Sequence, residues 1–286
     1  MVFVHGRGQE GRDPAVLTKE WLGGLAAGLG RAGLAPLDGA PVAFPFYGDE
    51  LFRITAELAR AGDRIELEAV PEDGAVPFHP FLPTDVGALE RRLVADLAAA
   101  HGAVGVEGGL LDGLQPVLSW DAARQTLEWL SRHTRMDREV IKAFLHDVAV
   151  YLTRGRDRVL DIVRAGLPAD GPIVLVSHSL GTVVARDLLD DLDVRARVRL
   201  WVTAGSPLAL PTVQRNLRTP GPRHPGVPWV STFDVNDIVA LGNPLRPGWG
   251  DPLTDLAVEN GDEPHAIDRY LGHPDLARAI DRAVTD

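Results

Sequence analysis

Short segments with apolar residues at successive positions recur along the chain, separated by segments with helical periodicity. Ile173-Val174-Leu175-Val176 is the clearest of them, and the others are Val2 to His5, Val42 to Tyr47, Val198 to Thr203, Trp229 to Phe233 and Leu253 to Val258. Strands of this kind belong to sheets that are buried on both faces. Their alternation with helices predicts an α/β fold with a mainly parallel sheet flanked by helices. Pro45 places the Val42 to Tyr47 strand near an edge of that sheet.

The length and composition fit one globular domain over residues 1–286. Hydrophobic residues make up 45% of the chain, which is enough for a core of ordinary size. The chain has no cysteine, which excludes disulfides, thiolate nucleophiles and Cys-ligated zinc. No His-Glu-x-x-His or similar ligand pattern is present, so we expect neither a metal nor an organic cofactor.

The charge balance disfavours polyanionic partners. The chain has 29 basic and 40 acidic residues, a net charge of −11, and such a surface repels the phosphates of nucleic acids and anionic membranes. No apolar run reaches the length of a membrane span. The chain opens directly on a predicted strand, without the features of a signal peptide, so a cytoplasmic location is expected.

One part of the chain does not alternate between strand and helix. From about Ser119 to Leu152 two helical patterns follow each other, and a glycine-rich stretch from Gly102 to Gly113 leads into them as a predicted loop. We predict a helical cap insertion over residues 103–165, either as a lid over a pocket or as plain core. The two apolar stripes consist of Trp120, Ala123, Leu127 and Leu130, and of Val140, Phe144, Val148 and Tyr151.

The strand Ile173 to Val176 runs directly into Ser177-His178-Ser179-Leu180-Gly181, and a helical pattern follows. A strand, a tight turn and a helix in this order are the context of a nucleophile elbow, in which the turn exposes a serine hydroxyl at the edge of the sheet. Ser177 stands where a glycine is usual, but serine is also small. The competing interpretation is that Ser177 and Ser179 only cap the helix.

The elbow and the helix Thr182-Val183-Val184-Ala185 resemble the lipase and esterase branch of the α/β-hydrolase superfamily. The resemblance extends from Phe3-Val4-His5-Gly6 to the last helix, although the two initial antiparallel strands of that family are missing. It implies that Ser179 is the nucleophile of a Ser-His-Asp triad. In this fold the acid and then the histidine follow the serine along the chain.

Residues after the later strands supply candidates for the acid and the base. Asp237, before Ile238-Val239, best matches the acid loop of the family, and Asp234 is the alternative. His265 lies between the last predicted strand and the last helix, where related hydrolases have their catalytic histidine. His273, before Pro274, is the alternative base and equally fits the start of a helix. His178 is too close to Ser179 along the chain to act as its base.

The segment Gly6-Arg7-Gly8-Gln9-Glu10-Gly11 has two interpretations. It matches the G-x-G-x-x-G pattern of dinucleotide-binding folds, but the next helix is predicted to start only after Asp13-Pro14. In the hydrolase interpretation the His5-Gly6 pair ends a strand beside an oxyanion hole, whose donors are the backbone N–H groups of Arg7 and Leu180. The Arg7 side chain either binds an anionic substrate group or is solvated.

The sequence therefore predicts a serine hydrolase that cleaves carboxylic esters through an acyl-enzyme, with Ser179 as nucleophile, His265 as base and Asp237 as the acid that orients it. The expected substrate is a small-molecule or lipid-like acyl compound. Amide, thioester or acyl-transfer chemistry on the same scaffold remains the alternative, because fold does not fix substrate. A further, less favoured alternative is a non-catalytic or dinucleotide-binding protein that uses the glycine loop.

Overall fold

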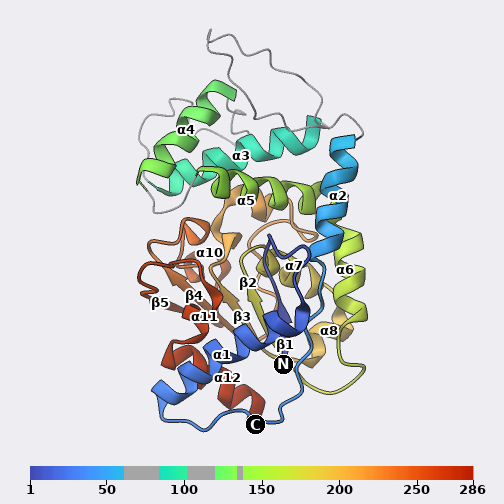
Figure 1. The fold of residues 1–286 in the computed structure, drawn as a ribbon, viewed down its shortest axis with the longest axis vertical. Helices are drawn as coiled ribbons and strands as arrows, with labels where there is room; N and C mark the ends of the chain where they lie inside the picture. The colour runs from blue at the N-terminus through green and yellow to red at the C-terminus, as the bar shows by residue number, and fades with distance from the viewer. Residues whose placement is uncertain (61–83, 102–119, 134–137, 286) are drawn as a thin grey trace.

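The computed structural model describes residues 1–60, 84–101, 120–133 and 138–285, and the predicted loop over Gly102 to Gly113 lies outside them. In these residues a five-stranded sheet is flanked by helices on both faces (Figure 1). The strands are β1 (Val2–Val4), β2 (Ile173–His178), β3 (Val198–Ala204), β4 (Trp229–Asp234) and β5 (Leu253–Val258). Five of the six predicted strands are therefore present with bounds close to the predicted ones.

The five strands lie side by side in chain order, and each neighbouring pair is parallel. The predicted mainly parallel sheet is thus all parallel within the described residues. Parallel strands bring all their carboxyl ends to one edge of the sheet, where the following loops meet. Segments after β1, β2, β4 and β5 therefore begin along the same edge of the sheet although they are far apart in the sequence.

The prediction of an extended strand from Val42 to Tyr47 is wrong. This segment makes a single parallel bridge, between Ala43 and Val2, beside β1. The Phe3 N–H donates to the Ala43 carbonyl, and the Ala43 N–H donates to the Met1 carbonyl, both at 2.9 Å. Pro41 and Pro45 on either side have no N–H to donate, which limits the pairing to this one point.

Two separate cores lie on the two faces of the sheet. On one face α1 (Pro14–Ala32), α11 (Ile267–Leu271) and α12 (Pro274–Thr285) pack against alternate strand residues such as Phe3 and Val176. Asp13 caps α1, as the sequence predicted. The larger core on the other face includes α2 (Gly48–Arg60), α6 (Arg156–Ala165) and α7 (Leu180–Leu188). Shorter helices complete the fold, namely α8 (Leu192–Arg197), α9 (Pro211–Arg215) and α10 (Arg246–Trp249).

Three helices form a layer at one end of the molecule, away from both termini (Figure 1). They are α3 (Thr84–Ala100), α4 (Trp120–His133) and α5 (Arg138–Val150), and α3 contacts both of the others. α5 continues through a π-helical turn into α6, which packs beside α7. The layer therefore differs from the predicted insertion at 103–165 at both ends. It includes α3, which precedes residue 103, and it excludes α6, which packs with the helices that cover the sheet.

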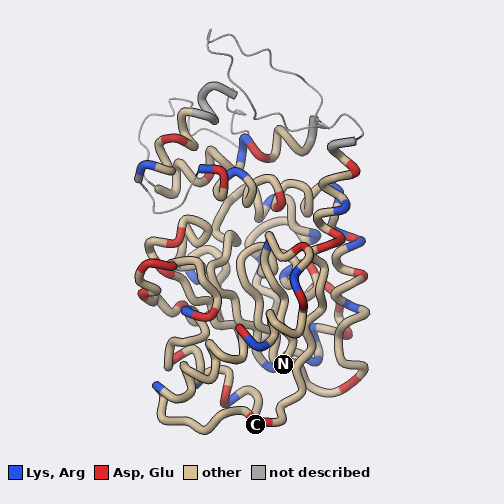
Figure 2. Tube along the Cα trace, viewed as in Figure 1, with Lys and Arg blue, Asp and Glu red and all other residues tan. Residues whose placement is uncertain are grey.

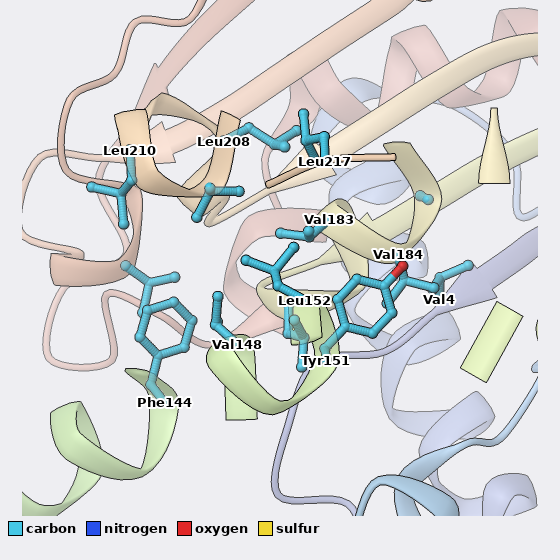
Figure 3. Packing of buried hydrophobic residues seen from close by; sticks show 14 of the residues in the cluster. Val4, Phe144, Val148, Tyr151, Leu152, Val183, Val184, Leu208, Leu210 and Leu217 are labelled. Carbon is cyan, nitrogen blue, oxygen red and sulfur yellow. The ribbon is translucent and has the colours of Figure 1, made fainter. Parts of the chain in front are cut away.

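The apolar stripe of α5 packs as core. Phe144, Val148 and the following Tyr151 are buried, whereas Val140 is exposed. Figure 3 shows these buried side chains facing Val183 of α7 and the segment from Leu208 to Leu210. In α4, Ala123, Leu127 and Leu130 are buried as predicted, and the side chain of Trp120 lies outside what the structure describes. The stripe of α5 therefore anchors the layer to the body.

Charged residues are distributed along the whole described chain, with acidic and basic positions intermixed (Figure 2). Many form short-range pairs on one helix, such as Arg53 with Glu50 and Glu57 on α2. No described helix combines the length and the apolar character that a membrane crossing requires.

Candidate active site

The turn between β2 and α7 places Ser179 in an unusual backbone conformation. Its φ is 54° and its ψ is −130°, and it is the only non-glycine residue with a positive φ in the described part of the chain. Such a conformation costs about 1–3 kcal/mol and persists only where the surrounding structure enforces it. Sequence reasoning had predicted a strained elbow at this residue.

The Ser179 hydroxyl is buried and has no hydrogen-bond partner among the described residues. It makes no capping bond to α7, and instead the Thr182 hydroxyl donates to the Ser179 carbonyl at 2.7 Å. The Ser177 hydroxyl donates to the Val202 carbonyl on β3 at 2.8 Å. The capping interpretation of both serines is therefore wrong. A buried polar atom without a partner is rare and calls for an explanation.

Close backbone packing surrounds Ser179. A Cβ added at Gly181 would lie 2.3 Å from the Val4 carbonyl oxygen, so α7 approaches β1 more closely than any side chain would permit. A Cβ added at Gly6 would lie 2.8 Å from the Ser179 Cβ. The loop after β1 therefore lies directly against the elbow.

The predicted acid and base are in contact. The His265 Nδ1 donates to the Asp237 Oδ2 at 2.7 Å, and the Val239 N–H donates to the other carboxylate oxygen at 2.9 Å. Asp237 is fully buried, whereas a quarter of the His265 side chain is exposed. With its Nδ1 proton held by the carboxylate, the imidazole can accept a proton at Nε2. No bond joins Nε2 to the Ser179 hydroxyl in this structure.

Gly205, the residue after β3, permits this contact. Its φ is 56°, and an added Cβ would lie 2.7 Å from the Asp237 Oδ2 and 3.0 Å from the His265 Nδ1. Since Ser179 donates its N–H to the Ala204 carbonyl at 3.0 Å, the end of β3 touches both the elbow and the Asp237–His265 pair. These parts form one site at the carboxyl edge of the sheet.

The alternative acid and base have other partners. Asp234 is buried and accepts N–H groups from Asn236 at 2.8 Å and from Asn260 at 2.6 Å, so it holds together the turns after β4 and β5. The His273 Nε2 lies 3.0 Å from the Asn260 Oδ1. The structure brings neither residue into hydrogen-bond contact with Ser179.

The two expected oxyanion donors lie on either side of the elbow. Leu180 is the first residue of α7, where backbone N–H groups have no partner within the helix. Arg7 follows Gly6, which lies against Ser179. The Arg7 side chain is not simply solvated, because its Nε pairs with the Asp147 Oδ2 of α5 at 2.6 Å.

His5 anchors the loop that carries Arg7. Its Nδ1 donates to the Gly6 carbonyl at 2.6 Å, and its Nε2 accepts the Tyr47 N–H at 3.1 Å. The Tyr47 hydroxyl donates in turn to the His5 carbonyl. Burial lowers the pKa of His5 to about 4, so the ring is neutral near pH 7 and keeps this pattern of bonds.

A cavity of about 230 Å³ lies beside the loop after β1. Gly6, Arg7, Gly8 and Glu10 line it from the loop, Leu51, Phe52 and Thr55 from α2, and Ala143, His146 and Asp147 from α5. His146 is partly buried, and its Nδ1 lies 2.7 Å from the Glu90 Oε1 of α3. The cavity combines apolar walls with a few polar groups, which is typical of small-molecule sites.

Sequence reasoning missed two residues of the site. The His178 Nε2 donates to the His265 carbonyl at 2.8 Å, and the two rings lie 4.6 Å apart. The Tyr270 hydroxyl donates to the Asp237 Oδ2 at 2.7 Å. The sequence marks His178 only as too close to Ser179 to act as its base, and it assigns Tyr270 no role. The one signal in the sequence for a role in the site was the short distance along the chain from His178 to Ser179 and from Tyr270 to His265.

The chain matched no protein-family model, no curated protein and no solved structure. Among the residues that the structure describes, no group of three or more His, Cys, Asp or Glu side chains could hold a metal ion.

Proposed function

We propose that this protein is a serine hydrolase of the α/β-hydrolase fold that cleaves carboxylic esters, with Ser179 as nucleophile, His265 as base and Asp237 as its orienting acid. The observation that carries the proposal is the Ser179 hydroxyl, which is unpartnered at the strained turn between β2 and α7. Structural serines usually satisfy their hydroxyl when buried. An unpartnered hydroxyl in a strained turn at the carboxyl edge of a parallel sheet is what a nucleophile requires.

The Asp237–His265 pair supports the same reaction. Asp237 fixes the Nδ1–H tautomer, so Nε2 can take the Ser179 proton as the hydroxyl oxygen attacks the ester carbonyl carbon. The imidazolium then protonates the leaving alcohol, which leaves an acyl-serine. A water molecule gives a proton to Nε2 and attacks the acyl carbon, and Ser179 recovers its proton when the acid product leaves. Catalytic hydrogen bonds are often loose before substrate binds, so the missing Ser179–His265 bond is compatible with this cycle.

The oxyanion that forms at each attack needs donors close to Ser179. The N–H groups of Leu180 and Arg7 meet this need, since one opens α7 and the other belongs to the loop that lies against Ser179. A cavity of about 230 Å³ is lined by Gly6 and Arg7 of this loop, although not by Ser179 or His265, and part of the substrate would occupy it.

Two contacts disfavour a dinucleotide at the glycine loop. The Gly11 N–H donates to the Asp49 carboxylate at 2.7 Å, and the N-terminus of α1 is capped by the Asp13 carboxylate. A pyrophosphate would need these same donors and would meet two negative charges.

Labelling with a fluorophosphonate probe tests the proposal. Wild-type protein should be modified at Ser179, and Ser179→Ala should abolish both labelling and hydrolysis of short-chain aryl esters. Ser231→Ala is a matched control, because Ser231 also has a buried hydroxyl without a partner but lies within β4. Its loss should leave labelling at Ser179 intact. Folded wild-type protein that resists the probe and hydrolyses no ester would refute the proposal.

A further inference from the structure

The carboxylate of Asp237 has a second strong donor besides His265. Its Oδ2 accepts the His265 Nδ1–H and the Tyr270 hydroxyl, each at 2.7 Å. Both donors therefore share one oxygen, while the other oxygen accepts a backbone N–H. Hydrogen bonds to an ionised acceptor are short and about twice as strong as neutral ones.

The direction of the Tyr270 hydroxyl is fixed. Its oxygen accepts the Asp234 N–H at 3.0 Å, which leaves its proton for Asp237. Tyr270 is fully buried. Burial and the charge of Asp237 raise the pKa of Tyr270 well above its usual value, so the phenol keeps its proton throughout the range in which a histidine titrates.

Tyr270 also links the segments that carry the acid and the base. It lies on α11, a helix of five residues that begins two residues after His265. Through its hydroxyl this helix is bonded to the end of β4 at Asp234 and to the loop that follows at Asp237. The His265 segment and the Asp237 loop are therefore held in register by one phenol.

We propose that Tyr270 is a positioning residue for the Asp237–His265 pair, which holds the carboxylate in place and draws part of its negative charge away from the imidazole. The catalytic consequence of this role rests on the proposed function, whereas its effect on the protonation of His265 does not. Two consequences follow from a shared Oδ2. Without the phenol the carboxylate is less firmly oriented, which slows catalysis, and its full charge acts on His265, which stabilises the imidazolium.

The groups that face His265 allow this effect to be isolated. Asp237 and Tyr270 meet its Nδ1 side, and His178 packs on its ring from the end of β2. Burial lowers the pKa of His178 well below its usual value, so His178 stays neutral. Glu263 and Arg269, on the same segment as His265, pair with each other at the surface. Asp237 is therefore the charged group in direct hydrogen-bond contact with the His265 ring.

The test replaces Tyr270 with phenylalanine, which keeps the ring and removes only the hydroxyl. Tyr270→Phe should lower kcat about 10-fold with KM nearly unchanged, and should move the acid limb of the pH–rate profile to higher pH. NMR of the His265 ring through a pH titration should show the protonation midpoint of the variant displaced to higher pH than that of the wild type. Tyr151→Phe is the matched control, because Tyr151 is equally buried and donates to the Asp187 carboxylate at 3.0 Å in the structural core. It should not move the titration of His265.

An unchanged or lowered midpoint of the His265 titration in folded Tyr270→Phe would overturn the proposal. The NMR titration needs no enzymatic activity, so a shifted midpoint in a protein without hydrolase activity would refute the proposed function and leave the positioning role standing. If Tyr270→Phe does not fold, protein labelled with 3-fluorotyrosine decides the matter. The fluorine signal of Tyr270 should follow the titration of His265 while that of Tyr151 does not, and a Tyr270 signal that ignores this titration would overturn the proposal.

Discussion

The Arg7 Nε lies 2.6 Å from the Asp147 Oδ2, in an ion pair that joins the loop after β1 to helix α5. Both side chains are largely buried, at 27% and 16% exposure. The pair therefore ties the loop that carries a proposed oxyanion donor to the helical layer. Because α5 is itself anchored in the core, this loop is held from two sides, by His5 beneath it and by Asp147 beside it.

Removing the Arg7 charge should destabilise the protein in a pH-dependent way. Arg7→Met keeps the aliphatic stem but leaves the Asp147 carboxylate buried without its partner, at a cost of about 1–3 kcal/mol. Burial already raises the pKa of Asp147, and Arg7 opposes that rise. A carboxyl group whose pKa is higher in the folded than in the unfolded state stabilises the fold at pH values below its unfolded-state pKa. That stabilisation is lost as the pH rises through its folded-state pKa. The destabilisation should therefore be larger at pH 7 than at pH 4, as measured by urea unfolding.

Arg12→Met is the control for this measurement. Arg12 forms an ion pair of the same 2.6 Å length with Glu20, but both side chains are more than 40% exposed. Exposed pairs contribute less than about 1 kcal/mol, so this variant should unfold nearly as the wild type does at both pH values. Equal losses in the two variants would show that the burial of the Arg7–Asp147 pair has no energetic weight.

The two candidate acids should respond differently to the same substitution. Asp237→Asn removes the charge that fixes the His265 tautomer, and kcat should fall about 10⁴-fold. Asp234→Asn keeps one acceptor for the neighbouring N–H groups and changes no contact of His265. It should lower the melting temperature while retaining most activity. Steady-state kinetics with thermal denaturation separates the two outcomes, and a dead Asp234→Asn with an active Asp237→Asn would reverse the assignment.

A parallel experiment separates the two histidines. His265→Ala should remove nearly all activity, approaching about 10⁶-fold as for other members of a triad. His273→Ala loses only the contact with Asn260 and should retain kcat within about 10-fold of wild type. Ester hydrolysis at saturating substrate is the measurement. Activity that survives His265→Ala but not His273→Ala would assign the base to His273.

Gly205→Ala should damage the site beyond its effect on the backbone. The residue has a φ of 56°, and its new Cβ would press on Asp237 and His265. Displacements of about 1 Å in a catalytic group cost about 100-fold in rate, so kcat should fall at least this far. Gly226→Ala is the control, since Gly226 has a φ of 78° with open space around it. Similar losses of stability but unequal losses of kcat are expected from the two variants.

Much of this architecture could be predicted because its signals are local. Strands β1 to β4 were recognisable from apolar residues that the sheet buries on both faces, whereas β5 is largely half-buried or exposed. The strand, turn and helix around Ser179 are contiguous in the sequence. The segment from Val42 to Tyr47 has the composition of a strand but pairs at one point only, because the neighbouring prolines lack donors. The apolar composition of a segment does not show where the backbone N–H groups needed for a ladder of hydrogen bonds are missing.

The supporting residues of the site were not predictable in this way. Tyr270 reads as an ordinary core residue of a short helix, and only the folded chain directs its hydroxyl to Asp237. His146 meets its partner Glu90 on another helix, 56 residues away in the sequence. Arg7 likewise meets Asp147 far along the chain. Each of these contacts depends on how distant helices pack, which periodicity does not encode.

The order of the strands along the chain has a consequence for folding during synthesis. The proposed oxyanion loop follows the first strand, the serine follows the second, the acid the fourth, and the base the last. During synthesis on the ribosome, Ser179 would therefore emerge and begin to fold long before His265 and Tyr270 exist. The nascent chain would carry an ordinary serine, and the proposed active site would become reactive only when the last strand and the segment after it have folded. Reaction with a fluorophosphonate would then mark the completion of folding.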